Sequence, residues 1–385
     1  MKIVLIGPAY PLRGGIANFV AQTAFHLEKN GHAVSIVNFS RQYPDFLFPG
    51  KTQLDVSRPA FPFSSKRIID SIRPGTWVKA ANYIQVLAPD LVLYNHWMPF
   101  FAPAYGTLAA LLRTRKAPAQ ICVCHNVTPH ERRPGDRILN RFFLRQMNAH
   151  IVLSKAVESD LQSLIPGAKI VKVLHPISES FGGAVPKKEA RNRLKLPADA
   201  PVLLFFGYVR RYKGLDILLR ALPRVLEKTP DARLLVVGEF YESKEEYDRL
   251  IETLGIENSV TVVDDFVPNE QVGFYFSAAD VVVMPYRSAT QSGIIPIAYE
   301  FARPVITTNV GGLSDFVDDE KTGILTEPEN PEAVAAAILK FIAIQDQIPF
   351  EQNIRHFQEN FSWSTLIESI EKLAENKWRS ASRSS

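Results

Sequence analysis

The chain is short of cysteine and of long apolar runs, and each shortage excludes a class of protein. Its 385 residues include two cysteines, Cys122 and Cys124, in the run AQICVCH. Their spacing matches neither a CxxC redox pair nor a zinc pair, so we expect buried thiols in a reducing compartment. No apolar stretch reaches the ~18 residues of a membrane-spanning helix, and MKIVLIG at the start is followed by no cleavage-site pattern. We therefore expect a cytoplasmic protein.

Clusters of metal-binding side chains and nucleotide fingerprints are also missing. The adjacent acids Asp264 and Asp265, and likewise Asp318 and Asp319, have no histidine or further carboxylate arranged beside them. We predict no dedicated metal site. The glycines after the first apolar run do not form the GxGxxG fingerprint, and no aspartate is placed about 20 residues further on. We expect no cofactor and no nucleic-acid partner.

What is present is the composition of a globular protein with two domains. Hydrophobic residues make up 46% of the chain and charged residues 22%, and 385 residues exceed one compact core. The formal net charge of +4 hides an asymmetry. The first 180 residues carry 21 Lys and Arg against 10 Asp and Glu, a net +11, and the rest carry 23 against 30, a net −7. The basic half is expected to meet an anionic partner, either a membrane surface or a charged substrate.

Apolar runs bounded by turns alternate with helix-period segments along the whole chain, which predicts parallel α/β sheets. We expect helices at 16–29 and 215–227, and strands at 2–6, 33–38, 91–94, 120–125, 150–153, 169–174, 202–206, 232–237, 260–263, 281–284, 304–307 and 323–325. The segment 175–200 is rich in Pro, Gly, Lys and Asp, which is typical of a linker. The predicted domains are therefore 1–175 and 176–361.

The densest group of functional signals lies in SATQSGIIPIAYEFARPVITTNVGG, residues 288–312. A glycine turn at Ser292, Gly293 and Ile294 opens a short helix that ends near Glu300, and a strand and a second glycine turn follow. The first backbone N–H groups of a helix and its dipole favour an anion. This layout predicts a site for a phosphate and a sugar.

A basic turn follows another predicted strand. Arg210, Arg211 and Lys213 lie in FFGYVRRYKG, directly after an apolar run. Cations at the carboxyl end of a strand lie where α/β folds bind ligands, and two of them can bracket a diphosphate. A solvated basic loop is the alternative.

Two features of the first half are candidates for ligand contact. Gly14 and Gly15 open the first predicted helix, where the backbone can approach a ligand, although a plain strand-to-helix turn explains them equally well. His125 ends the run ICVCH, where it can donate a hydrogen bond to a sugar hydroxyl or act as an acid or base near neutral pH. A structural histidine is the alternative. His130 and Glu131 are weaker candidates of the same kind.

Arginines recur every four residues just after this segment, with apolar residues between 138 and 144: Arg133, Arg137, Arg141 and Arg145. The pattern is that of a basic amphipathic helix, which can lie on an anionic bilayer. A surface helix whose apolar side belongs to the core is the other interpretation. The first would give the protein a peripheral position on the inner face of the cell membrane.

Taken together, these motifs resemble glycosyltransferase family 4, a family of retaining enzymes with the GT-B fold. The resemblance covers nearly the whole chain, through GGIANF, FFGYVRRYKGLDILL, LLVVGE, AADVVVMPYRSATQSGIIPIAYEFARPVITTNVGG and FSWSTLIESIEKL. It implies two Rossmann-like, doubly wound parallel-sheet domains facing across a cleft, with a final helix at about 362–378 that packs back on the first. The implied activity moves a sugar from a nucleotide diphosphate sugar to a glycan or glycolipid acceptor in polysaccharide biosynthesis.

The resemblance also implies roles for single residues. Glu300 matches the second glutamate of the family's E-x7-E signature, which binds the ribose of the donor. Arg210 and Lys213 resemble the basic pair that neutralises the diphosphate. His125 resembles the histidine beside the transferred sugar, and Gly15 resembles the glycine-loop position next to the diphosphate.

The chain departs from the family at the first signature glutamate, which is Ser292 here. A neutral hydroxyl thus replaces the carboxylate that contacts the donor sugar, while Gly293 and Ile294 still supply backbone N–H groups. This departure motivates one alternative function, a non-catalytic nucleotide-sugar-binding or scaffold protein. A nucleotide-sugar epimerase on the same fold is a second alternative.

Overall fold

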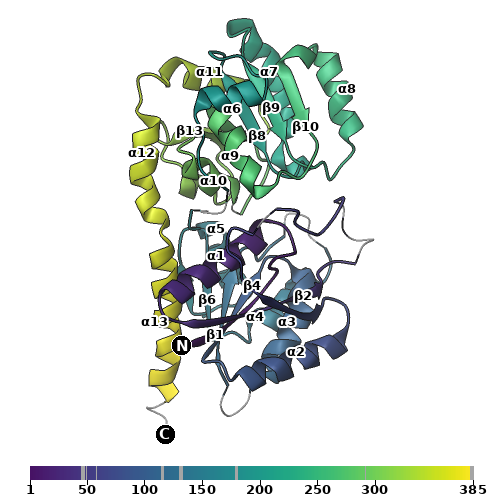
Figure 1. Cartoon of the computed structure of the whole chain (residues 1–385), viewed down its shortest axis with the longest axis vertical. Coiled ribbons are helices and arrows are strands. Elements are labelled where there is room, and N and C mark those ends of the chain that lie inside the picture. The colour runs from purple at the N-terminus through teal and green to yellow at the C-terminus, as the bar shows by residue number, and fades with distance from the viewer. Residues whose placement is uncertain are drawn as a thin grey trace. The chain divides into compact units, whose positions relative to one another are not determined.

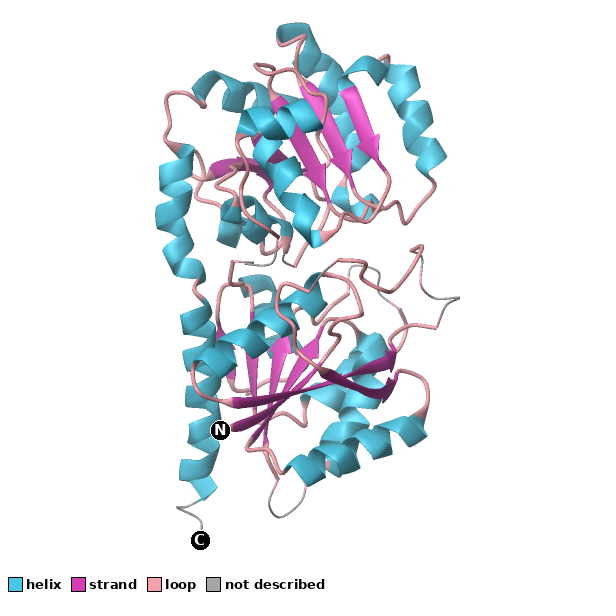
Figure 2. Cartoon of the chain, viewed as in Figure 1, coloured by secondary structure: helices cyan, strands magenta, loops and turns pink. Residues whose placement is uncertain are grey.

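The computed structural model describes residues 1–44, 48, 50–57, 59–113, 117–129, 133–177, 181–290 and 292–381. The candidates His130 and Glu131 lie outside these described residues. The chain divides into two compact units, each built around a parallel sheet (Figures 1 and 2). Unit 1 comprises Met1–Pro176 and Phe361–Ser385, and unit 2 comprises Ile177–Asn360.

Unit 1 contains a seven-stranded sheet whose direction of winding reverses at its centre. Its strands are β1 (Lys2–Ile6), β2 (Ala33–Arg41), β3 (Ser65–Asp70), β4 (Leu91–His96), β5 (Ala119–Cys124), β6 (Ala149–Val152) and β7 (Ile170–Lys172). The strand order is β3-β2-β1-β4-β5-β6-β7, so the reversal falls between β1 and β4. Doubly wound sheets bind ligands at the carboxyl ends of the strands beside such a reversal.

Helices cover both faces of this sheet. They are α1 (Gly15–Lys29), α2 (Pro74–Leu87), α3 (Ala102–Leu111), α4 (Asp136–Leu144), α5 (Lys155–Leu164) and α13 (Trp363–Ala381), with a 3₁₀ turn at Pro99–Phe101. Ile3 and Leu5 of β1 belong to one core with α1 and α13, whereas Val4 and Ile6 belong to the other. Successive side chains of a strand point to opposite faces, so a strand covered on both sides is apolar throughout.

Unit 2 repeats this scheme with six strands: β8 (Val202–Phe206), β9 (Arg233–Val237), β10 (Val260–Val263), β11 (Val281–Met284), β12 (Val305–Thr308) and β13 (Gly323–Thr326). Its helices are α6 (Lys187–Arg193), α7 (Leu215–Lys228), α8 (Lys244–Leu254), α9 (Asn269–Ala278), α10 (Ile294–Glu300), α11 (Pro331–Ile344) and α12 (Phe350–Phe357), with 3₁₀ turns at Arg211–Lys213, Glu257–Ser259, Leu313–Phe316 and Gln358–Phe361. The strand order β10-β9-β8-β11-β12-β13 puts the reversal between β8 and β11.

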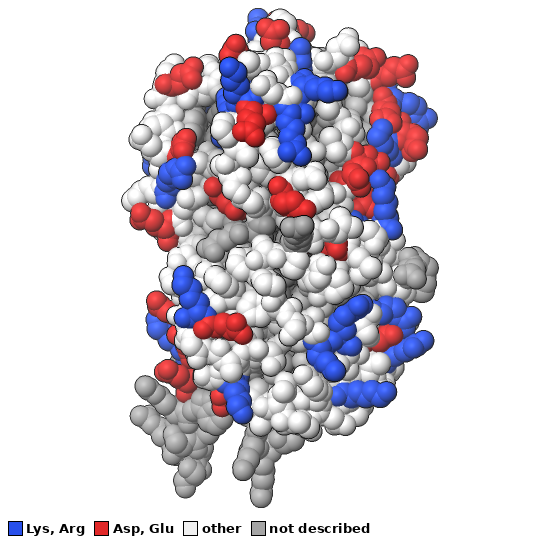
Figure 3. All heavy atoms as spheres, in the orientation of Figure 1, with Lys and Arg blue, Asp and Glu red and all other residues white. Residues whose placement is uncertain are grey.

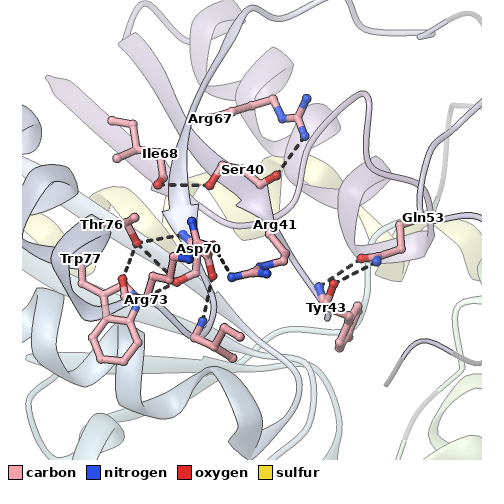
Figure 4. Close-up of polar contacts among 11 residues, drawn as sticks. Ser40, Arg41, Tyr43, Gln53, Arg67, Ile68, Asp70, Arg73, Thr76 and Trp77 are labelled. Carbon is pink, nitrogen blue, oxygen red and sulfur yellow. Dashed lines mark hydrogen bonds and ion pairs between the residues drawn. The ribbon is translucent and has the colours of Figure 1, made fainter. Parts of the chain in front are cut away.

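The predicted strands are confirmed with small shifts of their ends, but the edge strand β3 was not predicted. Its sequence, SKRIID, has mostly exposed residues at its start and buried ones at its end, so it lacks the apolar run of the other strands. The strand is fastened by side chains that its own sequence does not reveal. Arg67 donates to the carbonyl oxygens of Phe39 and Ser40, at 3.2 and 3.1 Å, where the pairing of β2 with β3 is irregular (Figure 4).

Asp70 joins β3 to β2 and α2. Its carboxylate lies 2.7 Å from Nη2 of Arg41, and its carbonyl oxygen accepts from the indole N–H of Trp77 at 2.7 Å (Figure 4). On the face of unit 1 shown in Figure 3, Lys and Arg side chains gather over the side of the sheet formed by β2 and β3. The exposed basic residues of β3 are Lys66 and Arg67, and exposed Arg73 follows the strand.

Within the described ranges, no helix is long and apolar enough to cross a bilayer, and no three His, Cys, Asp or Glu side chains are grouped to hold a metal ion. Cys122 and Cys124 are buried free thiols whose sulfur atoms lie 3.6 Å apart, as predicted.

Candidate functional site

The candidate site of unit 2 lies where the sheet reverses, at the carboxyl ends of β8 and β11. Gly207 follows β8 with a φ of +98°, and two predicted site residues pack over its Cα. A Cβ added at Gly207 would lie 3.0 Å from Nζ of Lys213 and 3.2 Å from Cδ1 of Ile294. Gly207 is thus required both by its backbone angle and by the close approach of these side chains. The structure brings Lys213 and Ile294 together as neighbours.

The turn that carries Lys213 is fixed by Arg287, which follows β11. Its guanidinium group donates to both carboxylate oxygens of Asp216, at 2.8 and 2.7 Å, and to the carbonyl oxygen of Arg211 at 2.7 Å. Burial alone would raise the pKa of Asp216, but the hydrogen bonds and charge of Arg287 hold that pKa below its usual value. Gly214 completes the turn with a φ of +72°, where a Cβ would lie 2.0 Å from the carbonyl oxygen of Pro285.

Lys213 is a buried cation whose charge has no counter-ion in the described part of the chain. The residue is 7% exposed, and its Nζ lies 5.8 Å from the centre of the Tyr286 ring. Burial, together with the nearby positive charge of Arg210, lowers the pKa of Lys213 to about 7. A buried ammonium group is unstable without an anion. Lys213 is therefore a candidate for contact with an anion.

Arg210 flanks the same turn. Its guanidinium carbon lies 5.0 Å from the centre of the Tyr241 ring, and its charge acts on Lys213. The next residue, Arg211, donates its backbone N–H to the carboxylate of Glu242 at 2.8 Å. Arg210 is thus close enough to Lys213 for its charge to lower the pKa of the lysine.

The second glycine turn predicted in residues 288–312 packs against the segment that leads into the first, at Ala289. Gly311 has a φ of +53°, and a Cβ there would lie 1.6 Å from the carbonyl oxygen of Ala289. The N–H of Gly312 donates to the same oxygen at 3.2 Å, and the hydroxyl of Thr308 donates to the carbonyl of Tyr286 at 2.6 Å. The segment between β11 and α10 is therefore held by backbone contacts that only glycine permits.

Ser292, Gly293 and Ile294, which were predicted to contact the nucleotide-sugar donor, lie at the start of α10. Ser292 is 7% exposed and lies before the helix, and its hydroxyl accepts from the N–H of Ile294 at 3.2 Å. Gly293 has no described atom within 4 Å of an added Cβ, so its backbone faces open space. An open backbone beside a helix start is accessible to an anion.

Glu300 is the last residue of α10, about 9 Å along the helix axis from its first residue at 1.5 Å per residue. The end of the helix is anchored by Tyr299, whose hydroxyl donates to the carbonyl of Phe316 at 2.7 Å and lies 2.9 Å from the hydroxyl of Thr322. Gln358 donates to the carbonyl of Tyr299. Glu300 is half-buried, and its position is set by this anchor.

In unit 1, the predicted glycine turn lies after β1, beside the reversal of the sheet. Gly14 has a φ of +116°, and neither Gly14 nor Gly15 has a described atom within 4 Å of an added Cβ. Only Gly14 needs to be glycine for its backbone angle. Gly15, the first residue of α1, offers an open helix start.

His125 directly follows β5 and is 2% exposed. Burial, followed by the charges of His175 and His96, lowers its pKa well below the usual value. The histidine is therefore neutral at pH 7, which favours the predicted hydrogen-bonding role over the predicted acid or base role. Its Nε2 lies 3.2 Å from Oδ1 of Asn95, and the Phe19 ring packs edge-on against it at 4.7 Å.

The sequence did not single out Asn95, Asp216 or Arg287. Arg287 lies just after an apolar strand. Arg210 was singled out by the same position, so Arg287 could have been found in the same way. Asn95 lies at the carboxyl end of β4, beside the reversal of the sheet. Its amide donates to the carbonyl of Ile6 at 3.5 Å, which leaves Oδ1 to accept from His125.

The arginine repeat does not form one uniform face. Arg137 belongs to α4, Arg133 precedes the helix, and both line a pocket of unit 1. The apolar residues of the helix are also divided, because Phe143 and Leu144 are buried whereas Ile138 is 74% exposed and Phe142 48% exposed.

Two family models match the chain. The model for glycosyl transferases group 1 matches residues 200–343, and the model for glycosyltransferase family 4 matches residues 13–180. The fold and these matches confirm a two-domain α/β protein of the GT-B class. The chain belongs to the glycosyltransferases of family 4 and group 1, as the motifs implied.

Curated relatives agree with this assignment. The chain is 32% identical over 195 residues to a D-inositol 3-phosphate glycosyltransferase of Corynebacterium urealyticum, which covers 48% of this chain and 45% of that protein. It is 27% identical to D-inositol 3-phosphate glycosyltransferase 1 of Catenulispora acidiphila, over 93% of this chain and 89% of that protein. In the matches to the Corynebacterium proteins, this chain spans about half of each relative's length.

A solved structure shares the fold over nearly the whole chain. The structure of Anabaena Alr3699/HepE in complex with UDP has a TM-score of 0.76 and 16% identity, and the match covers 98% of this chain and 100% of that one. At this identity, the similarity shows a common fold.

Proposed function

We propose that this protein transfers a sugar from a nucleotide diphosphate sugar to a glycan or lipid-linked acceptor, with retention of anomeric configuration. The observation that carries the proposal is Lys213, a buried lysine at the carboxyl edge of the unit 2 sheet that pairs with no carboxylate among the described residues. Family membership and the UDP complex of a structural neighbour support a nucleotide diphosphate as the anion.

In the proposed reaction, the diphosphate is the leaving group, and negative charge grows on it as the bond to the sugar breaks. Lys213 and Arg210 stabilise that charge, together with the backbone N–H groups near Gly293 and Ile294. Because Arg287 holds the turn in place, the cations need no rearrangement when the charge develops. Glu300 would hold the ribose, as the family signature implies.

The site proposed for the sugar lacks the first carboxylate of the family signature. Ser292 offers a hydroxyl there, and neutral His125 offers a hydrogen bond to a sugar hydroxyl. Loss of the carboxylate alters the choice of sugar more than the departure of the diphosphate, since the cations and N–H groups that stabilise the diphosphate are retained.

The test combines a screen of nucleotide diphosphate sugars by thermal shift with an assay for release of the nucleotide diphosphate. A ligand that binds only the folded protein raises its melting temperature. We expect one donor to stabilise the wild type and to be turned over, and Lys213→Ala to lose both effects. Lys228→Ala, which removes an exposed lysine of α7, is the matched control. Tight donor binding without turnover, with or without acceptor, would instead support a scaffold protein, and interconversion of the donor sugar would support an epimerase.

A peripheral position on the cytoplasmic face of the membrane is a second part of the proposal. It is supported by the exposed apolar residues Ile138 and Phe142 of α4, which lie in the same segment as Arg141 and, just after the helix, Arg145. We expect the wild type to co-sediment with anionic vesicles and Ile138→Ser to bind less. Val86→Ser removes an even more exposed apolar side chain, from α2, and should bind normally. Equal binding of Ile138→Ser and wild type contradicts this part of the proposal.

A further inference from the structure

Tyr286 lies two residues after β11, beside the buried Lys213. The tyrosine is 3% exposed, and the ammonium nitrogen of Lys213 lies 5.8 Å from the centre of its ring. An ammonium group over an aromatic ring is attracted by the negative face of that ring. The Tyr286 ring therefore forms part of the surroundings of the lysine at the carboxyl edge of the unit 2 sheet.

Backbone and ring contacts fix the position of Tyr286. Its carbonyl oxygen accepts from the hydroxyl of Thr308 at 2.6 Å, and its backbone N–H donates to the carbonyl of Met284 at 2.9 Å. The Tyr212 ring packs edge-on against the Tyr286 ring, with 5.9 Å between the ring centres. The backbone N–H of the next residue, Arg287, donates to the carbonyl of Tyr212 at 2.7 Å. The rest of unit 2 thus holds the phenol ring in one place.

The phenol hydroxyl of Tyr286 is buried, and it forms no hydrogen bond of normal geometry in the described part of the chain. Buried tyrosine hydroxyls usually find a partner, because a buried polar group without one costs folding free energy. Burial, followed by the charge of Tyr212, raises the pKa of the phenol, and the nearby hydroxyl of Ser292 lowers it in part. Since the pKa remains raised, the phenol keeps its proton and can donate it to an acceptor.

Two neighbours of the Tyr286 hydroxyl are also donors: the ammonium group of Lys213 and the hydroxyl of Ser292. The Oγ atom of Ser292 accepts from the backbone N–H of Ile294 at 3.2 Å, and its O–H bond can donate as well. Among the described residues, no carboxylate contributes to the pKa shift of Lys213 or of Tyr286. The ligand atom that matches these donors is an oxygen that carries negative charge.

Tyr105 of α3 also has a buried hydroxyl that lacks a hydrogen-bond partner among the residues that the structure describes. It lies in the core of unit 1, with the rings of Tyr94, Phe101 and Phe143 at 5.7, 6.2 and 5.4 Å from its own. The surroundings of Tyr105 are thus aromatic, whereas Tyr286 lies beside an ammonium group and a second hydroxyl. Tyr105 is therefore a matched control for a hydroxyl without a ligand.

We propose that the hydroxyl of Tyr286 donates a hydrogen bond to an oxygen atom of the anion that Lys213 binds. The identification of this anion with the diphosphate of the sugar donor rests on the proposed function, whereas the contact with an anion does not. Tyr286→Phe isolates the contact, because phenylalanine keeps the ring beside Lys213 and removes only the hydroxyl.

Hydrogen exchange of the ligand-free full chain tests whether the hydroxyl supports the fold. Removal of a buried hydroxyl without a partner should not weaken unit 2, so the most protected amides of β11 and β12 should exchange no faster in Tyr286→Phe than in wild type. In Tyr299→Phe they should exchange at least about fivefold faster, because the Tyr299 hydroxyl donates to the carbonyl of Phe316 at 2.7 Å. Faster exchange in Tyr286→Phe, as in Tyr299→Phe, would show that the hydroxyl is structural and would overturn the proposal.

Titration calorimetry with inorganic pyrophosphate, UDP and UDP-glucose measures the contact itself. We expect Tyr286→Phe to bind pyrophosphate and UDP about tenfold more weakly than wild type, because a hydrogen bond to a charged group is lost. Tyr105→Phe should bind both as the wild type does. Equal losses in the two variants, wild-type affinity in Tyr286→Phe, or no binding of either anion to the wild type would each contradict the proposal. A loss confined to UDP-glucose would also contradict it, since the hydroxyl would then contact the sugar.

Turnover of a nucleotide diphosphate sugar by the wild type judges the proposed function separately. Pyrophosphate tests the contact of Tyr286 without depending on the base or the sugar of the donor. If Tyr286→Phe loses affinity for pyrophosphate but no nucleotide sugar is turned over, the transferase proposal fails and the anion contact stands. If a donor is turned over and Tyr286→Phe binds pyrophosphate and UDP as the wild type does, the transferase proposal stands and the role of Tyr286 is wrong.

Discussion

The guanidinium group of Arg287 donates to both carboxylate oxygens of Asp216, at 2.8 Å and 2.7 Å, although the two residues are 71 positions apart in the chain. The same guanidinium group donates to the carbonyl of Arg211, within the turn that carries Lys213. The contacts of Arg287 therefore fix the position of the turn, and with it the position of the Lys213 side chain.

We expect Arg287→Lys to raise the KM for the donor by about tenfold, since a lysine cannot make the paired contact and also reach the carbonyl. Stability should change by less than about 1 kcal/mol, because the two side chains are 24% and 32% exposed. Steady-state kinetics and thermal unfolding check both parts. The control is Arg355→Lys, since Arg355 forms an exposed pair with Glu351 on α12. An unchanged KM would show that the turn holds its position without Arg287.

Much of this candidate site could be predicted from the sequence because its residues lie in loops that follow apolar strands. Arg210 and Lys213 follow the carboxyl end of β8 in the loop before α7, and the turn at Gly293 lies in the loop between β11 and α10. Parallel strands bring such loops to one edge of the sheet. Arg287 and Asp216 could not be paired in this way, since nothing local joins residues 71 positions apart.

Strand β3 could not be predicted for a related reason. It is held by side-chain contacts to β2 and α2, made by Arg67 and Asp70, rather than by an apolar run of its own. Likewise, the sequence shows the spacing of the four arginines but not that Arg133 and Arg137 line a pocket while Arg141 does not. That division depends on how α4 packs against α5 and the loop after β5.

The affinity for the nucleotide diphosphate should depend on pH through Lys213. With a pKa of about 7, this lysine loses its proton in the free protein above pH 7, and it must regain the proton to pair with an anion. Binding should therefore weaken by up to about tenfold per pH unit between pH 7.5 and 9. Titration calorimetry of UDP in buffers of different ionisation enthalpy measures this proton uptake.

Lys213→Arg is the control for the pH dependence, because an arginine keeps its charge at these pH values. Its affinity for UDP should vary little between pH 7.5 and 9, even if it is lower throughout. The same slope in wild type and Lys213→Arg would assign the proton to another group.

Asn95 fixes the tautomer of His125, because its Oδ1 accepts from Nε2 while its amide nitrogen donates to the carbonyl oxygen of Ile6. Asn95→Asp places a carboxylate at the same position and should raise the pKa of His125. NMR titration of the histidine ring signals should then show one more histidine that becomes protonated between pH 8 and pH 5. Transfer should fall at acidic pH, where His125 would be charged. Unchanged ring signals in Asn95→Asp would show that the side chain at position 95 does not influence the protonation of His125.

Gly311→Ala should disrupt the donor site and destabilise unit 2. The new Cβ would lie 1.6 Å from the carbonyl oxygen of Ala289, and alanine disfavours a φ of +53°. We expect a loss of at least about 2 kcal/mol of folding free energy, together with loss of donor binding. The matched substitution Gly75→Ala, in α2, meets no atom within 4 Å and should leave both unchanged. Urea unfolding and UDP titration measure the two effects, and a Gly311→Ala protein that binds UDP normally would exclude the packing of the second turn against Ala289.

Unit 1 should lose stability in mild acid because His96, His125 and His150 are buried and His175 is half-buried. Burial lowers the pKa of each below the usual 6.5, to about 4 for His96. Below pH 6.5 the histidines of the unfolded chain bind protons, whereas the same histidines stay neutral in the folded unit. The free energy of unfolding therefore falls as the pH drops. Above pH 6.5 this effect is absent. Each histidine contributes up to about 1.4 kcal/mol per pH unit within its window.

The four tryptophans report on this unit alone, since Trp77, Trp97, Trp363 and Trp378 all belong to it. Urea unfolding followed by their fluorescence should therefore give a free energy of unfolding that is constant from pH 8 to pH 7 and declines from pH 6.5 to pH 5. Replacing the exposed His356 in unit 2 by glutamine should leave this decline unaltered. A free energy of unfolding as high at pH 5 as at pH 7.5 would mean that these histidines are not held neutral by burial.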